Sequence, residues 1–175
     1  MARSFRAAVV LCGLGQTLRG DDAAGLEAVR RWRAAHPRWA RQPWLRVRLL
    51  EVPELGLLEA LEGAAAALLV DAVHSGAPPG AMHRLSAADV AAFGSGAGSA
   101  HGWGVAETLA LARTLGVPLP PRLALLGVEA GALRWGVGLS PAVAAAMPQA
   151  VAAIQQWVAK EEKMLLVHGT EITGR

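Results

Sequence analysis

Three side chains of this sequence are of the types that together can bind a divalent metal ion. Asp22 lies in the glycine-rich loop GLGQTLRGDDAAG, Asp71 lies near the end of the apolar run AAALLVDAV, and His101 lies in the loop FGSGAGSAHGWG. Two carboxylates and one imidazole offer oxygen and nitrogen donors that suit a borderline divalent metal and leave coordination positions open. In an open α/β sheet, loops from different strands converge beyond the carboxyl ends of the strands, where these three residues would meet.

The acidic pair in the first loop argues against a phosphate site. A glycine-rich turn after a strand often holds phosphate with backbone N–H groups and positive charge, and Asp21 and Asp22 would repel that anion. A dinucleotide fingerprint would also need a third glycine where the sequence has Leu18. The loop therefore suits a cation, or a helix start that one of the two aspartates caps.

Asp71 and His101 also have ordinary explanations. A carboxylate within a run of Ala, Leu and Val is costly to bury uncompensated, so Asp71 either contacts a cation or accepts hydrogen bonds from backbone N–H groups of the next loop. His101 could be a loop histidine without a role, and His74, which closely follows Asp71, is a rival ligand. The other histidines lie in contexts typical of the surface: His36, His83 and His168.

Nucleophilic catalysis by a cysteine is disfavoured. Cys12 is the one cysteine of the chain and lies within an apolar run that predicts a strand, where a thiol is typically inert packing. A catalytic pairing with His101 has nothing else in its favour. A single cysteine also excludes an intramolecular disulfide and fits a reducing compartment.

The apolar pattern predicts the elements that would position these residues. Short, nearly continuous apolar runs are typical of parallel strands that are buried on both faces, and they cover residues 6–12, 45–52, 65–73 and 122–128. Residues 81–85 follow a turn and predict an edge strand. Segments with helical spacing separate the runs. The expected fold is therefore a three-layer α/β/α sandwich with a twisted, mostly parallel sheet of about five strands and one antiparallel edge strand.

Helix boundaries are marked by residues that favour them. Gly116 suits the carboxyl-terminal cap of a helix that starts near Val105. Ser140 and Pro141 suit the N-cap and the first turn of the last helical segment. Pro148 is expected to break that segment, so that a second helix follows it.

Length and composition indicate one globular domain. The chain has 175 residues, 53% of them hydrophobic, and we expect a single domain over 1–175 with a core over about 5–160 and a C-terminal tail over about 161–175. No apolar run is long enough to span a bilayer, and residues 1–15 lack the cleavage site of a signal peptide. We therefore expect a cytoplasmic protein without membrane insertion.

A basic segment with tryptophans is the one feature that could indicate nucleic-acid binding. The formal net charge is +3, and much of the positive charge lies in residues 30–48, where arginines are interleaved with tryptophans. An amphipathic helix end followed by an exposed loop explains the segment more simply, so no nucleic-acid partner is expected.

The first loop is similar to the opening signature of the nickel–iron hydrogenase maturation endopeptidases, G-x-G-N-x-L-x-x-D-[DE]-x-x-G. The matching positions are Gly13, Gly15, Leu18, Asp21, Asp22 and Gly25. The likeness continues through LLVDAVHSGAPPGAM, SAHGWGVAETLALARTLG and LLGVEAGALRWGVGLSPAVAAAMP, in the family's order, and covers about residues 6–158. Four ordered matches make the resemblance specific.

The resemblance implies an α/β fold and an endopeptidase that removes the C-terminal peptide of a hydrogenase large-subunit precursor after nickel insertion. It implies that Asp22, Asp71 and His101 are the metal-contacting and catalytic residues of an aspartic-type, metal-dependent enzyme. Nickel would arrive bound to the precursor, which would explain the acidic loop, and zinc or cadmium could replace it in vitro. The expected substrate-binding residues are Gly13, Gly15, Gln16, Asp21 and Trp103.

The chain departs from the family's pattern at three places. Gln16 stands where the signature has asparagine, and Ala23 stands where many members have glycine. The usual D-G-G-T-type stretch is replaced by EVPELG at 51–56, which resembles a variant of some soluble-hydrogenase proteases. These departures leave open which hydrogenase is the partner.

Two points about the expected function remain alternatives. A nickel- or precursor-binding chaperone would use the same three metal contacts and would differ only in leaving the precursor uncut. We expect a monomer with a shallow groove that Trp103 and Trp135 line, unless these tryptophans pack in the core.

Overall fold

The sheet at the centre of the molecule has five strands. The computed structural model describes residues 9–51, 54–93, 104–131 and 133–171. The strands are β1 (Val9–Leu14), β2 (Leu45–Leu50), β3 (Ala66–Val73), β4 (Met82–Ser86) and β5 (Arg122–Glu129), in the spatial order β2-β1-β3-β5-β4. β4 runs antiparallel to β5 at one edge, and all other neighbours are parallel. This confirms the predicted sheet, including its edge strand.

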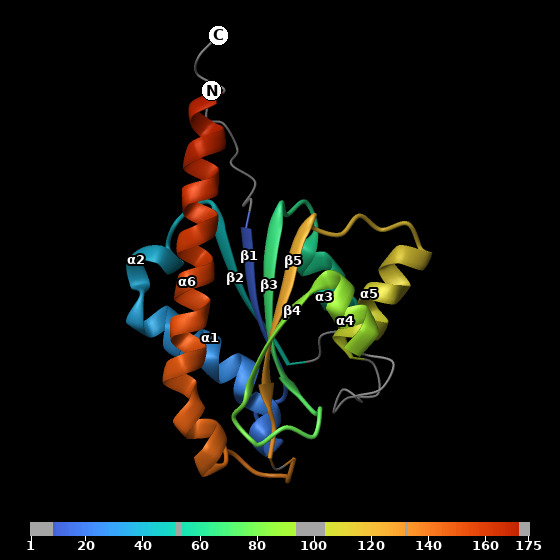
Figure 1. Cartoon of the computed structure of the whole chain (residues 1–175), viewed down its shortest axis with the longest axis vertical. Coiled ribbons are helices and arrows are strands. Elements are labelled where there is room, and N and C mark those ends of the chain that lie inside the picture. The colour runs from blue at the N-terminus through green and yellow to red at the C-terminus, as the bar shows by residue number, and fades with distance from the viewer. Residues whose placement is uncertain (1–8, 52–53, 94–103, 132, 172–175) are drawn as a thin grey trace.

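Helices cover both faces of the sheet and complete three layers (Figure 1). α1 (Ala24–Ala35) and the long α6 (Pro141–Glu171) pack on one face. α3 (Glu54–Leu61), α4 (Ala87–Phe93) and α5 (Val105–Thr114) pack on the other. Two short elements, the 3₁₀ helix η1 (Gly20–Ala23) and α2 (Pro37–Ala40), precede and follow α1. The predicted three-layer sandwich is confirmed.

The alternation of side chains along β1 explains why both faces are covered. Val9 and Leu11 pack in the core shared with α1 and α6, whereas Val10, Cys12 and Leu14 pack in the core shared with the other helices. Successive side chains of a strand point to opposite faces, so a strand that is apolar at every position must be buried on both. β3 follows the same rule, since all of its residues are buried.

α6 is one continuous helix, so the prediction that Pro148 breaks it is wrong. A proline inside a helix removes one backbone hydrogen bond and crowds the preceding turn, at a cost of about 3 kcal/mol. Burial on both sides of the proline offsets this cost, because Val143, Met147 and Ile154 are fully buried in the core. The helix also includes residues 161–171, most of the segment expected to be a tail.

The end of α5 confirms the role of Gly116. Gly116 has φ +67, the N–H of Val117 donates to the carbonyl oxygen of Ala112 at 2.8 Å, and the N–H of Gly116 donates to that of Arg113 at 3.2 Å. This is the Schellman arrangement, for which glycine is favoured.

Among the described residues, none of the helices combines the length and the apolar character that crossing a bilayer requires.

The tryptophans of the basic segment 30–48 contribute to packing. Trp32 is fully buried, and its Nε1–H donates to Oε1 of Gln155 at 3.0 Å. Trp39 and Trp44 meet edge to face with ring centroids 6.3 Å apart and pack against the core. These contacts fit the interpretation of the segment as an amphipathic helix end followed by a loop, to which the structure adds the short helix α2 and the start of β2.

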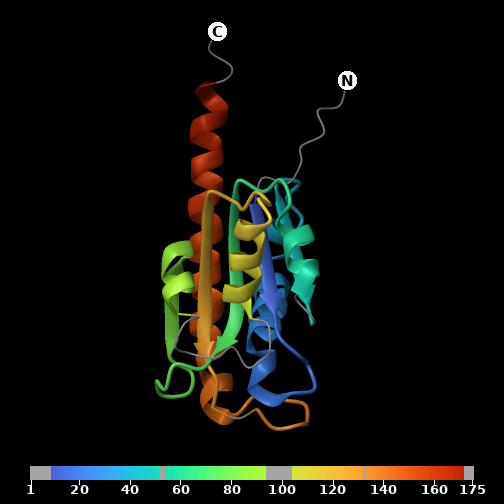
Figure 2. The same ribbon diagram turned by 90° about the vertical axis from the view of Figure 1, so that its right-hand side faces the viewer.

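The carboxyl ends of the parallel strands lie together at one end of the molecule (Figure 2). The loops after β1, β3 and β5 all leave the sheet at this end, whereas the C-terminal part of α6 projects from the opposite end. Because ligands of open α/β sheets bind at the carboxyl ends of strands, this is where the predicted site belongs.

Candidate functional site

The loop after β1 is seated on β1 and β3 by two glycines. Gly15 has φ +137, and a Cβ built on it would lie 1.9 Å from the backbone oxygen of Asp22. A Cβ on Gly25 would lie 2.1 Å from the carbonyl oxygen of Val70 and 2.5 Å from that of Leu14. Since only glycine fits these positions, the two residues set the path of the loop that carries the aspartates.

Asp22 is buried on η1, beyond the carboxyl end of β1. Its side chain is 0% exposed, and its Oδ2 accepts a hydrogen bond from the backbone N–H of Gln16 at 2.9 Å. Because the donor is a backbone group, the replacement of asparagine by Gln16 leaves this contact in place. Gly13 lies earlier, inside β1, and a Cβ there would lie 2.8 Å from the carbonyl oxygen of Gly25. η1 packs against β3, so the element that carries Asp22 lies beside β3 as well as after β1.

Asp71 is a buried carboxylate near the carboxyl end of β3. It is 8% exposed, and its Oδ1 accepts a hydrogen bond from the N–H of Ala72 at 2.8 Å. By the alternation of β3, Asp71 points to the face that α3, α4 and α5 cover, as Cys12 does. Burial raises the pKa of the Cys12 thiol to about 12, the Asp71 charge adds to the rise, and Arg48 opposes it. The thiol is thus protonated at neutral pH, in agreement with the prediction that it is inert packing.

Asp22 lies in the loop after β1, and Asp71 lies near the carboxyl end of the neighbouring parallel strand β3, so both carboxylates lie at the same edge of the sheet. His101, the third predicted ligand, lies outside the described residues, and so does Trp103. Within the described part of the chain, no three His, Cys, Asp or Glu side chains gather as a metal-binding group. α5 begins at Val105 and packs on the face to which Asp71 points. The structure places the two carboxylates of the predicted triad. The triad as a whole stays a prediction.

His74, the rival ligand, follows β3 directly. Its Nε2 is buried and has no hydrogen-bond partner among the described residues. A buried nitrogen in this state remains available to a ligand. Both His74 and His101 therefore stay candidates.

Asp21 is fully buried and ties the loop after β1 to the loop after β5. Its Oδ1 accepts from the backbone N–H of Ser140 at 2.6 Å, and its Oδ2 accepts from the Ser140 hydroxyl at 2.8 Å and the N–H of Gly131 at 2.9 Å. The expectation that Asp21 or Asp22 caps the following helix is wrong, because within residues 9–51 neither η1 nor α1 has a side-chain cap. The carboxylate for which substrate contact was expected is engaged by the protein's own donors.

Sequence reasoning missed a second polar cluster at this edge, centred on Glu129. Glu129 ends β5 and is 1% exposed. Its Oε1 accepts from the N–H groups of Ser75 and Gly76 at 2.8 and 3.0 Å, and its Oε2 accepts from the Ser75 hydroxyl at 2.8 Å and contacts Nε2 of His83 at 2.9 Å. The prediction of an ordinary surface context for His83 is wrong. The overlooked signal was a glutamate at the end of the apolar run RLALLGVE.

We expect the free energy of unfolding to depend on pH through the carboxyl group of Glu129. Burial raises the pKa of Glu129, but hydrogen bonds from Ser75, His83 and Gly76 outweigh it and leave the pKa below its ordinary value of 4.5. A carboxyl with a lowered pKa in the fold stabilises above its unfolded pKa, and this contribution is lost as pH falls through the folded value. In urea unfolding, Glu129→Gln should therefore be less stable than the wild type at neutral pH, and the difference should shrink below about pH 4.5. A difference that does not change with pH would contradict this.

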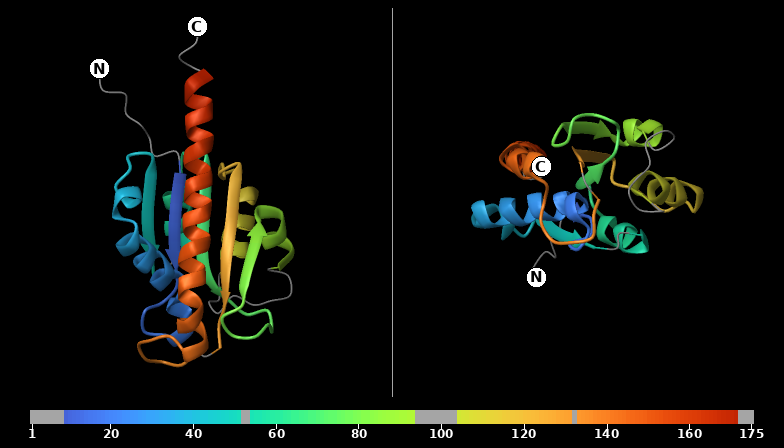
Figure 3. Two further views of the ribbon diagram at one scale, coloured as in Figure 1. Left: turned by 60° about the vertical axis from the view of Figure 1, so that its left-hand side comes forward. Right: turned by 90° about the horizontal axis from the view of Figure 1, so that it is seen from below.

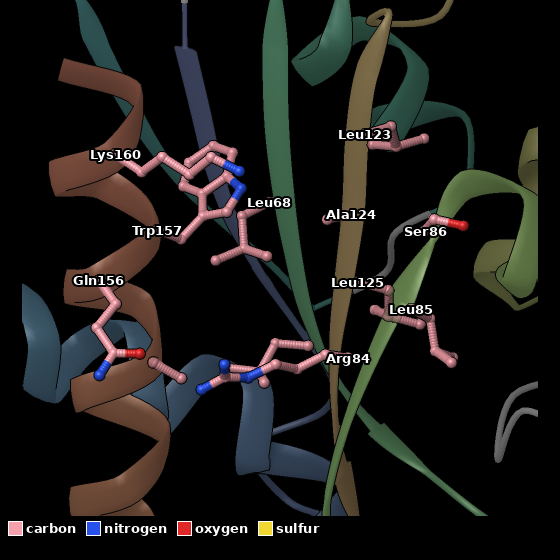
Figure 4. A pocket seen from close by; sticks show the side chains of 12 residues that line it. Leu68, Arg84, Leu85, Ser86, Leu123, Ala124, Leu125, Gln156, Trp157 and Lys160 are labelled. Atoms are coloured by element: carbon pink, nitrogen blue, oxygen red, sulfur yellow. The ribbon is translucent and has the colours of Figure 1, made fainter. Parts of the chain in front are cut away.

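An apolar groove lies away from this edge, between α6 and the strands β4 and β5 (Figure 4). It has a volume of about 420 Å³, with Trp157 and Lys160 of α6 facing Arg84 of β4 across it. Among the described residues, none of the predicted site residues lines it. The groove expected beside Trp135 is therefore a different feature, and Trp135 itself does not pack in the core, because it is 81% exposed in the loop after β5.

Comparisons with known proteins agree on one family. A model of the hydrogenase maturation protease family matches residues 54–157. The chain is 34% identical over 157 residues to the hydrogenase expression/formation protein HupD of Rhodobacter capsulatus, and the match covers 85% of this chain and 72% of that protein.

Solved structures of hydrogenase maturation proteases share the fold. The hydrogenase maturating endopeptidase HybD from Escherichia coli superposes with a TM-score of 0.73 at 24% identity, covering 87% of this chain and 93% of that one. The [NiFe] hydrogenase maturation protease HybD from Thermococcus kodakarensis superposes with a TM-score of 0.67 at 25% identity, covering 86% and 98%. The predicted α/β fold is thus confirmed by comparison as well.

Proposed function

The chain belongs to the hydrogenase maturation protease family, and from this premise we propose that it is an endopeptidase that removes the C-terminal extension of a nickel–iron hydrogenase large-subunit precursor after nickel insertion. The observation that carries the proposal is the pair of buried carboxylates, Asp22 and Asp71, at the ends of neighbouring strands. Each carboxylate accepts a hydrogen bond from a backbone N–H group, and carboxylate oxygens are also ligands for a divalent metal ion. A substrate that brings a metal ion to this edge would meet these oxygens.

Nickel enters this proposal as part of the substrate. Asp22 and Asp71 contribute oxygen donors, and His101 contributes a nitrogen donor, to an ion that the precursor already holds. A precursor without nickel offers these side chains nothing to bind, so its scissile bond is not held at the site. Zinc or cadmium accepts the same donor types and would replace nickel in vitro.

Hydrolysis in this proposal uses a water molecule. The raised pKa of Cys12 keeps its thiol protonated, and the Ser75 hydroxyl donates to the Glu129 carboxylate at 2.8 Å, with Nε2 of His83 farther from it at 3.4 Å. A carboxylate can take a proton from the attacking water, and a bound ion can polarise the scissile carbonyl. Asp22 and Asp71 thus give the enzyme its aspartic character.

The proposal also includes where the protein acts. We place it in the cytoplasm, because its single cysteine is a free thiol, as a reducing compartment favours. We also propose that it acts as a monomer. Sedimentation of the purified chain reads its oligomeric state directly.

Mass spectrometry of the precursor tests the proposal. Nickel-loaded precursor incubated with this chain should lose its C-terminal extension, whereas nickel-free precursor should keep its full mass. Equal cleavage of both forms would contradict nickel sensing. Binding without cleavage of either form would instead indicate a maturation chaperone.

The same assay separates the two candidate histidines. His101→Ala should lower processing by about a hundredfold or more, because a metal contact is removed. His74→Ala should process as the wild type does. The reverse result would assign the third contact to His74, whose Nε2 has no hydrogen-bond partner among the described residues.

A further inference from the structure

Three large apolar side chains are exposed on two loops at the carboxyl end of the sheet. The exposed fractions are 59% for Leu18, 81% for Trp135 and 75% for Val137. We refer to these three residues as the loop patch. In the described part of the chain the other exposed large apolar residues lie on α6 or just after α5: Leu115, Val117, Leu166 and Val167. Clustered exposed apolar side chains mark interaction surfaces more often than scattered ones.

The two loops that carry the loop patch are joined to each other. The N–H of Gly136 donates to the carbonyl oxygen of Leu18 at 3.0 Å, and the N–H of Gly20 donates to that of Gly136 at 3.1 Å. The Asp21 carboxylate adds hydrogen bonds from Ser140 and Gly131. The patch is thus presented by a connected backbone, which lowers the ordering entropy that a docking partner must offset.

The loop patch lies where a substrate of the proposed site has to approach. Figure 3 shows the loop after β1 and the loop before α6 together at the end opposite the projecting part of α6. Leu18 belongs to the same loop as Asp22, and Trp135 follows β5 at the same edge. A chain that presents a bond to Asp22 therefore passes close to this surface.

The charges around the loop patch favour an acidic partner. Arg134 is exposed next to Trp135 and places a positive charge beside the loop patch. Glu51, which accepts from the Thr17 hydroxyl, is itself paired with Arg30 at 3.7 Å. Complementary charge sets register and speeds association.

We propose that the loop patch is the docking surface for the hydrogenase precursor, and that it takes a segment in which a large apolar side chain lies next to an acidic one. This rests on the proposed function for the identity of the partner. Docking supplies affinity away from the reacting bond and does not depend on nickel. It separates recognition of the precursor as a protein from recognition of its metal.

Binding of nickel-free precursor, which the protein does not cut, measures docking by itself. Titration calorimetry should show that the double variant Trp135→Ala/Val137→Ser binds this precursor at least about tenfold more weakly than the wild type. Arg134→Glu should weaken binding as well and reduce its dependence on salt. With nickel-loaded precursor, the double variant should show a raised KM and a kcat close to that of the wild type.

Leu115→Ser is the matched control, because Leu115 is 62% exposed after the carboxyl end of α5, away from the loop patch. It should bind the precursor as the wild type does. Unchanged binding by the double variant, or no binding of nickel-free precursor by the wild type, would overturn the docking proposal. If the double variant instead converts a dimer of this chain into a monomer in sedimentation, the patch serves self-association and the proposal fails. Binding that depends on the patch without any cleavage would leave docking intact and remove the proposed endopeptidase activity.

Discussion

Replacing Asp71 with alanine is expected to abolish processing of the nickel-loaded precursor and to leave the chain folded. The carboxylate is buried among apolar residues of β3, so its removal relieves desolvation and should change the free energy of unfolding by no more than about 1–2 kcal/mol. Processing should fall by about a thousandfold or more, because both metal contact and water activation need the carboxylate. Mass spectrometry reads the processing, and circular dichroism with urea unfolding reads the fold.

Two further variants make the Asp71 result specific. Asp71→Asn keeps the shape of the side chain without its charge and should be nearly as inactive. Glu59→Ala removes an exposed carboxylate of α3 and should process normally. The Cys12 thiol gives an independent reading, since loss of the Asp71 charge should lower its pKa. A folded Asp71→Ala chain that still cleaves the precursor would remove Asp71 from the site.

The sheet could be predicted from sequence because its signal is local. β3 is buried at every position, and the side chains of β1 pack in both cores. Their apolar runs are therefore continuous, whereas an amphipathic helix has apolar residues every three or four positions. The same property draws attention to Asp71, since a charge stands out in such a run. The glycine-rich loop after β1 could also be predicted from its sequence. The reason for Gly25 needs the structure, because a Cβ at this position would collide with the carbonyl oxygen of Val70.

The side-chain contacts that hold the site together could not be predicted, because they join distant segments. Asp21 reaches partners 110 and 119 positions away, while its local sequence suggests only a helix cap. Glu129 meets His83 across a separation of 46 positions. Pro148 shows the same limit in another form, because the local rule for proline is overridden by packing along the whole of α6.

Replacing Asp21 with alanine is expected to destabilise the fold and to weaken processing through the loops. The change leaves the backbone N–H groups of Ser140 and Gly131 and the Ser140 hydroxyl without their acceptor. The loss of these partly buried hydrogen bonds should lower the free energy of unfolding by about 3 kcal/mol, and thermal unfolding should occur about 6–12 °C lower. Processing should fall by about ten- to a hundredfold at a temperature where the variant is still folded, because the loop that carries Asp22 is no longer tied to the loop before α6.

Ser140→Ala tests whether Asp21 acts by tying the two loops together or by contacting the substrate directly. It removes one of the three donors that the described residues offer to Asp21 and should cost about 1 kcal/mol, with processing close to that of the wild type. Asp21→Asn should resemble Asp21→Ala, since its amide places a donor against the donors that the carboxylate accepts. If Asp21→Ala unfolds at the temperature of the wild type but fails to process, the carboxylate acts on the precursor directly. In that case the hydrogen bonds from Ser140 and Gly131 to Asp21 would have to open when the precursor binds, and hydrogen exchange at the N–H of Gly131 would increase in its presence.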